Sequence, residues 1–211
     1  TFDDQGRGRF EGWPWHAIPL PEEFAGTPIY FRIFSDYTDI GLWGEVSIME
    51  QPALTLFIVK NSLEALVISG FSALIALLAM IFALLQTEKK SFGSIALFSL
   101  SSAVLLLSDS QASQLIWNLP MMWDYLAAGS YYMLPVAMAL LLEQWFSDRR
   151  PWLINLVWKI HLVYAVVAIG LALMGVVDLS STYPPFDALL LASLATVTVV
   201  VVKRFRQLKI E

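Results

Sequence analysis

The sequence contains no cysteine and only two histidines, His16 and His161, which excludes several kinds of site at once. Without cysteine there is no disulfide, no thiolate metal site and no cysteine nucleophile. The sequence also lacks a phosphate-binding glycine loop, an HExxH zinc helix and a Gly-x-Ser-x-Gly elbow. We therefore expect a chain that is not an enzyme, with no catalytic residue, no metal site and no cofactor.

Charge is scarce as well. Charged residues make up 15% of the chain and hydrophobic residues 57%, whereas soluble domains carry about 25% charged residues. Long apolar segments follow one another between Asn61 and Val202, and about 20 such residues are enough to cross a bilayer. The pattern predicts a mainly α, polytopic membrane helix bundle with spans at about 62–86, 91–108, 122–146, 152–176 and 185–203.

Lys and Arg are missing from two of the connections between these spans, 108–121 and 177–187. The other two connections carry them at 88–90 and 148–150, and the last span is followed by a basic run at 203–209. Short cytoplasmic loops keep an excess of Lys and Arg. The pattern therefore predicts a multi-pass protein of the plasma (inner) membrane, with a periplasmic or extracellular N-terminus and a cytoplasmic C-terminus.

Residues 1–53 have a different character and are predicted to form a short β-rich external segment. Aromatic and β-branched residues at 28–34 and 41–49 are typical of strands, and residues 35–39 between them are typical of a turn. Two strands are not stable alone in water. We expect further residues, the membrane helices or a second subunit to complete them. The chain starts at Thr1 without a signal-peptide pattern, so we expect a fragment or a processed chain.

Three tryptophans and a histidine in this segment are candidates for a ligand site: Trp13, Trp15, His16 and Trp43. Their rings could form a stacking surface for a small molecule or a carbohydrate. Packing in an aromatic core or at the membrane interface explains the tryptophans more simply. His16, beside two tryptophans, is then a hydrogen-bonded structural residue. Both interpretations stay open at this point.

Ionisable residues inside the spans are few, and three of them lie toward the cytoplasmic side: Glu143, Lys159 and His161. Ionisable groups at membrane depth are candidates for function. These three could instead form a structural clamp between the third and fourth spans, with Lys159 extending toward the interface. Pro135 is expected to kink the third span. The cluster is therefore either a clamp or part of a signalling switch.

Several stretches together resemble a known family. They are the external residues 12–21 (GWPWHAIPLP), 30–36 (YFRIFSD) and 40–44 (IGLWG), with 142–146 (LEQWF) and 158–162 (WKIHL) in the spans. On these residues the chain resembles the bacterial seven-transmembrane receptors with diverse intracellular signalling modules. Two departures stand out: only five spans are present, and the chain carries no output module.

The resemblance implies that residues 1–53 end a jelly-roll-like sensor domain and that residues 54–211 hold the first five of seven helices. An external ligand would then act on a cytoplasmic kinase, cyclase, diguanylate cyclase or phosphatase by shifting a population, with the first span moving first. The implied partners are membrane lipid, the external ligand, the signalling module and a second copy in a homodimer, but not nucleic acid. The alternatives are a structural or partner-dependent membrane subunit and, less favoured, a transporter.

Overall fold

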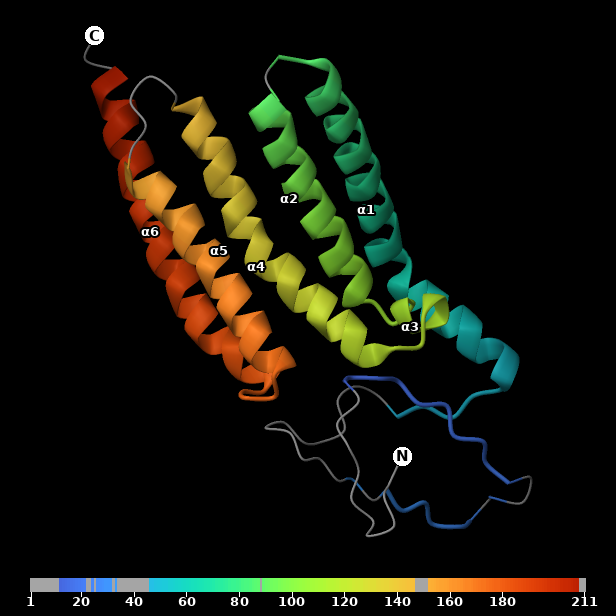
Figure 1. The fold of residues 1–211 in the computed structure, drawn as a ribbon. Coiled ribbons are helices and arrows are strands. Elements are labelled where there is room, and N and C mark those ends of the chain that lie inside the picture. The colour runs from blue at the N-terminus through green and yellow to red at the C-terminus, as the bar shows by residue number, and fades with distance from the viewer. Residues whose placement is uncertain are drawn as a thin grey trace.

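The structure is a computed structural model that describes residues 12–21, 24, 26–31, 33, 46–87, 89–146 and 152–208, with side chains as far as Val202. From residue 51 onward these ranges are almost entirely helical (Figure 1). The elements follow in the order α1 (Gln51–Leu85), α2 (Lys89–Ser108), α3 (Ser113–Ile116), α4 (Pro120–Trp145), α5 (Trp152–Leu173), the 3-10 helix η2 (Leu179–Thr182) and α6 (Tyr183–Leu208).

Five helical stretches in the described ranges are long and apolar enough to cross a membrane. They are α1, α2, α4, α5 and the stretch Leu179–Val202, which joins η2 to α6. The prediction of a mainly helical, multi-pass membrane protein is therefore confirmed. The connection between the second and third spans holds the short helix α3, which the sequence pattern did not predict.

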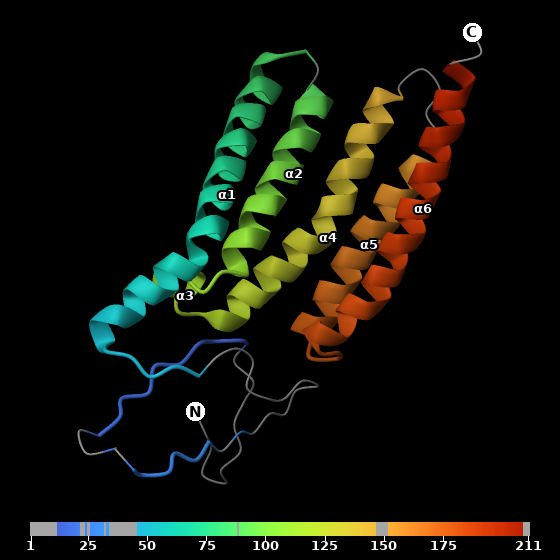
Figure 2. The ribbon, with the colours of Figure 1, turned by 180° about the vertical axis from the view of Figure 1, so that it is seen from behind.

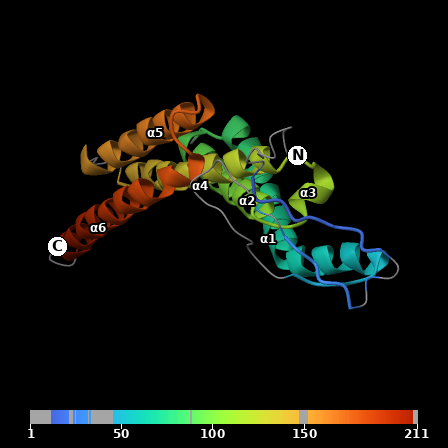
Figure 3. The same ribbon diagram turned by 90° about the horizontal axis from the view of Figure 1, so that it is seen from below.

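Several span boundaries differ from the predicted ones, and two of the differences have a clear local reason. α1 begins at Gln51 rather than near residue 62, with Pro52 in its first turn, where proline is well tolerated. Its first part leans away from the other helices (Figure 1, Figure 3). α5 ends at Leu173 because Gly175, at φ 70°, closes a C-terminal cap. The N–H groups of Gly175 and Val176 donate to the carbonyls of Ala172 and Leu171, each at 3.0 Å.

The predicted β-rich character of the N-terminal segment is not confirmed. The described residues of this segment, among them 28–31, 33 and 46–50, contain no strand. The predicted turn at 35–39 and most of the second predicted strand lie outside the described residues. Aromatic and β-branched composition favours a strand only where a neighbouring strand or helix buries it. Composition alone was therefore not enough to predict strands in this segment.

The spans are arranged in a row in which α1 packs on α2, α2 on α4 and α4 on α5 (Figure 1, Figure 2). Small residues occupy the contact face of α1, where Ser69 and Ala76 are buried. The Oγ of Ser69 donates to the carbonyl of Ala103 on α2 at 2.8 Å. Lipid chains are as apolar as leucine, so close approach between small residues and such hydrogen bonds holds helices together.

The two ends of the bundle differ in composition. The α1–α2 connection with Lys89 and Lys90 lies at one end, together with the end of α6. The N-terminal segment, α3 and η2 lie at the opposite end (Figure 1, Figure 2). Among the described connections, the one between α1 and α2 is thus followed directly by Lys, whereas 109–119 and 174–178 at the opposite end contain no Lys or Arg. This sorting is the one that the predicted orientation requires.

The absence of cysteine makes the orientation directly testable with single introduced cysteines. Val176, 64% exposed after α5, and Thr87, exposed in the α1–α2 connection, lie at opposite ends. In intact cells we expect Val176→Cys to react with a membrane-impermeant maleimide and Thr87→Cys to react only after permeabilisation, because Lys and Arg keep their loops cytoplasmic. Labelling of Thr87→Cys but not Val176→Cys in intact cells would mean the inverted orientation.

Candidate functional site

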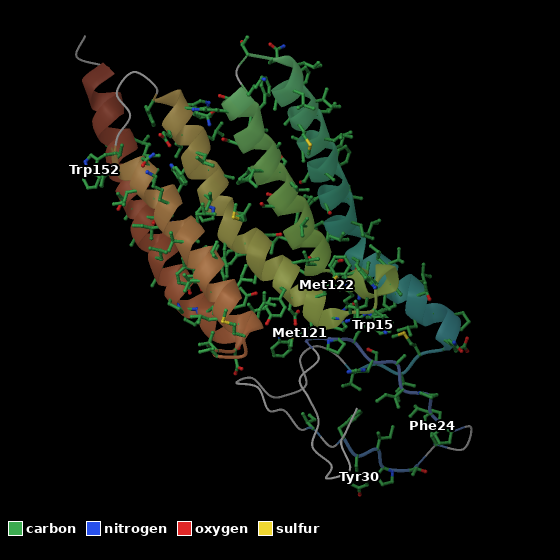
Figure 4. The ribbon with its side chains drawn as sticks, viewed as in Figure 1. Trp15, Phe24, Tyr30, Met121, Met122 and Trp152 are labelled. Carbon is green, nitrogen blue, oxygen red and sulfur yellow. The ribbon has the colours of Figure 1, made fainter. Side chains whose placement is uncertain are left out.

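The N-terminal segment is docked on the helix bundle through residues 12–17. The indole Nε1 of Trp15 donates to the carbonyl of Gln111, in the connection between α2 and α4, at 3.0 Å. The backbone of Trp13 donates a hydrogen bond to the carboxylate of Asp124, one turn into α4. Figure 4 shows Trp15 beside α3 and the start of α4, whereas Phe24 and Tyr30 lie away from the helices. The contact therefore joins the N-terminal segment to the start of α4. After the predicted orientation, we call this end of the bundle the outer end and the end with Lys89 and Lys90 the inner end.

Gly12 is the point of closest approach in this contact. Its φ is 93°, and a Cβ placed on it would lie 2.6 Å from Oδ2 of Asp124 and 2.8 Å from the backbone nitrogen of Met121. It would also lie 2.9 Å from the carbonyl carbon of Pro120. Both the left-handed backbone and the missing side chain are properties that only glycine offers. The segment can therefore reach α4 this closely because residue 12 is glycine.

The connection that receives the segment is itself tied to two helices. The N–H of Ala112 donates to Oγ of Ser62 on α1 at 3.1 Å. The indole of Trp123, on α4, donates to the carbonyl of Trp117 at 2.7 Å. The docked segment thus rests on a surface that contacts α1, α2 and α4 together. These contacts link the N-terminal segment to the bundle at a second place, beside the covalent link through α1.

A cleft of about 380 Å³ separates the docked segment from α3 and its flanking residues. Trp15 and His16 line one side, and Gln114, Leu115 and Asn118 line the other. The sequence analysis selected Trp15 and His16 but missed the two amides, whose spacing of four residues in a span-connecting loop was the available signal. Trp13, 44% exposed, does not line this cleft, and Trp43 lies outside the described residues.

Glu143, near the inner end of α4, contacts α5 as the clamp interpretation requires, but through other partners. Its carboxylate accepts hydrogen bonds from Nδ2 of Asn155 at 3.2 Å and from Nε1 of Trp158 at 2.9 Å. Lys159 places its Nζ 5.5 Å from the ring centroid of Trp158. In the described part of the chain, neither Lys159 nor His161 bonds to Glu143. The three residues that were predicted to form one cluster therefore do not form a single hydrogen-bonded group.

The next residue of α4 makes the corresponding contact on the other side. Nε2 of Gln144 donates to Oγ of Ser94, on α2, at 2.9 Å. The Oγ of Ser94 in turn donates to the carbonyl of Lys90 at 3.0 Å. Two adjacent residues, Glu143 and Gln144, thus hold the inner end of α4 between α5 and α2. Sequence analysis missed Gln144 because an amide near a helix end carries no charge signal.

His161 is fully buried and belongs to a different group of side chains. Its Nδ1 lies 3.0 Å from the carbonyl of Val157 in its own helix, and its Nε2 has no hydrogen-bond partner among the described residues. Its ring stands edge-on to Phe186 of α6, with centroids 5.6 Å apart. The imidazole is thus part of the packing between α5 and α6 rather than of the Glu143 clamp.

A tyrosine cluster between α4, α5 and η2 holds the outer half of the bundle. Tyr132 is fully buried, and its hydroxyl lies 2.5 Å from Oγ1 of Thr182. Since Thr182 donates its only hydroxyl proton to the carbonyl of Leu179, Tyr132 is the donor. Tyr164 donates to the carbonyl of Thr182 at 2.6 Å, and Tyr131 to Asp187 at 2.8 Å. The described residues include no group of His, Asp and Glu side chains that could hold a metal.

Comparisons with protein-family models, with curated proteins and with solved structures found no match for this chain. Two arrangements in the structure therefore carry the functional argument. One is the docked N-terminal segment with its cleft, and the other is the pair of hydrogen-bonded clamps at the inner end of α4.

Gly12→Ala is expected to undock the N-terminal segment. The added Cβ meets backbone atoms of Pro120 and Met121, so we expect a cost of about 1–2 kcal/mol, equivalent to a five- to thirtyfold weaker contact. Hydrogen exchange of residues 12–21 should rise accordingly. Gly26→Ala is the matched control, because Gly26 also has a positive φ, 81°, but open space around it. Unchanged exchange in Gly12→Ala would contradict the docked contact.

Glu143→Ala is expected to loosen α4 from α5, because it removes the acceptor of two interhelical hydrogen bonds. At about 0.6 kcal/mol for each bond in a membrane protein, the free energy of unfolding should fall by about 1 kcal/mol. Lys159→Met should change it by less than about 0.5 kcal/mol. Reversible unfolding in mixed micelles measures both. Equal destabilisation by the two substitutions would mean that Lys159 is part of the clamp after all.

Proposed function

We propose that this chain is the membrane-embedded region of a sensory receptor that passes an external signal to a cytoplasmic output module. The docking of residues 12–17 on the outer end of α4 carries this proposal. It offers an external event a second, non-covalent entry into the bundle beside the covalent link through α1. The output module, a kinase, cyclase, diguanylate cyclase or phosphatase by the family resemblance, lies outside this chain.

The helix suited to carry the signal inward is α4. It reaches from Asp124, which binds the docked segment, to Glu143 and Gln144, which hold α5 and α2 at the inner end. Pro135 lies between these ends and removes the hydrogen bond to the carbonyl of residue 131, which makes the helix easier to bend there. A shift at one end of α4 would therefore change its contacts with two helices at the other.

The cleft beside Trp15 is the proposed place of the external ligand. Its volume of about 380 Å³ lies in the range of small-molecule sites, about 300–1,000 Å³. Trp15 supplies an aromatic surface, while Gln114 and Asn118 supply amide donors and acceptors. These groups suit a small polar ring compound such as a sugar. Since one wall is the docked segment, a ligand that fills the cleft would favour the docked state.

Coupling between the two ends is testable without knowing the ligand. We expect the undocking substitution Gly12→Ala to change the distance between spin labels at Thr87→Cys and Trp152→Cys, both at the opposite end of the bundle. Trp152 is 70% exposed at the start of α5, and Figure 4 shows it far from Trp15. Helix shifts of about 1–2 Å are typical of such transitions. Double electron–electron resonance on the protein in nanodiscs measures this distance between the labels.

Gly26→Ala is again the control and should leave the distance distribution as it is in the parent chain. If Gly12→Ala undocks the segment by hydrogen exchange but leaves the distance unchanged, the receptor proposal fails. A rigid structural subunit would behave in that way, because its helices have no second arrangement for the external segment to select.

A further inference from the structure

An apolar groove of about 230 Å³ runs along α4 between α2 and α6. Its lining comes from these three helices and, through Val157, from α5, and polar atoms contribute almost nothing to it. The residues that define it are Phe98 of α2, Leu134, Pro135 and Met138 of α4, and Leu190 and Leu194 of α6. The groove is thus built from side chains that neither the clamps nor the external cleft use.

The groove is about as long as one bilayer leaflet is thick. It extends along α4 from Tyr131 to Leu142, about 16 Å at 1.5 Å per residue. Half of a hydrocarbon core of about 30 Å is nearly the same length. Its lining on α4 begins at Tyr131, near the middle of the helix, and continues to Leu142, toward the end of the bundle that carries Lys89 and Lys90. Ordered water needs two to four polar partners, which this lining does not offer, so hydrocarbon is the occupant that fits.

We propose that this groove binds an acyl chain of an anionic phospholipid from the leaflet on the basic side. Two of the helices that line the groove, α2 and α6, carry Lys or Arg in their sequences at that end. α2 begins with the exposed Lys89 and Lys90, and α6 continues beyond Val197 with Lys203 and Arg204 in its sequence. Clusters of Lys and Arg next to a span attract anionic head groups. The apolar groove and the positive charge therefore both fit an anionic phospholipid.

A second copy of the chain fits this groove less well. Helices approach closely in lipid through small residues, but the exposed rim here is formed by large side chains, with Met138 43% and Leu194 61% exposed. A helix is about 10 Å across, so it would lie over the rim and leave the groove beneath it open. A flexible acyl chain can follow the floor past Pro135 and Leu142.

Ser193→Phe tests the apolar part of the site. Ser193 is buried and lines the groove, so the added ring displaces about two or three CH₂ groups of the chain. Retention of phosphatidylglycerol by the detergent-purified protein, measured by native mass spectrometry, should fall about 15- to 50-fold. Ala195→Phe, at an exposed position of the same helix, adds the same ring outside the groove and should retain the lipid as the parent chain does. Ser193→Leu is the milder substitution should the phenylalanine prevent folding.

The double substitution Lys203→Gln and Arg204→Gln tests the charged part. In the parent chain we expect bound phosphatidylglycerol and little phosphatidylcholine, and in the double variant a smaller preference for phosphatidylglycerol, because Lys89 and Lys90 remain. Equal retention of both lipids by the parent chain would overturn the proposal. So would a dimer that retains no lipid and dissociates when Ser193 is enlarged, because the groove would then be an interface between copies.

Discussion

The arrangement of the helices depends on how α4 is held, because it stands in the middle of the row and contacts α2 and α5. In lipid the hydrophobic effect does not draw apolar helices together, so specific hydrogen bonds and close packing must do so. Adjacent residues of α4 supply these bonds in opposite directions, Glu143 to α5 and Gln144 to α2. Tyr132 supplies the corresponding bond near the outer side. Each is short and directional, and the bond of Tyr132 is buried.

At its outer end, α4 contacts both the docked N-terminal segment and the loop that precedes it. Backbone reaches backbone at Gly12, and the loop beneath is bonded to α1 through Ser62. An event in the external segment can thus affect two helices, one through the chain and the other through contact. The same helix ends in bonds to both of its neighbours, which is what the proposed signalling route requires.

Packing is uneven around the row, and the unevenness has a chemical cause. α1 and α2 meet through serine and alanine, which let the backbones approach closely. α2 and α6 present phenylalanine and leucine beside α4, where the apolar groove lies. The first contact holds helices together, whereas the second is the groove for which we propose a lipid. Residue size, rather than hydrophobicity, separates these two roles.

The sequence by itself determined the membrane class, the number of spans and the sorting of basic residues to one end, because hydropathy and charge act over whole segments. It also selected Glu143, His161 and Trp15, since their residue types are unusual where they stand. Only the tertiary structure decided their partners: Asn155 and Trp158 for Glu143, aromatic packing for His161, and the loop before α4 for Trp15. The absence of strands in the described N-terminal residues was likewise a tertiary outcome. Contacts between distant segments depend on distances that no local pattern encodes.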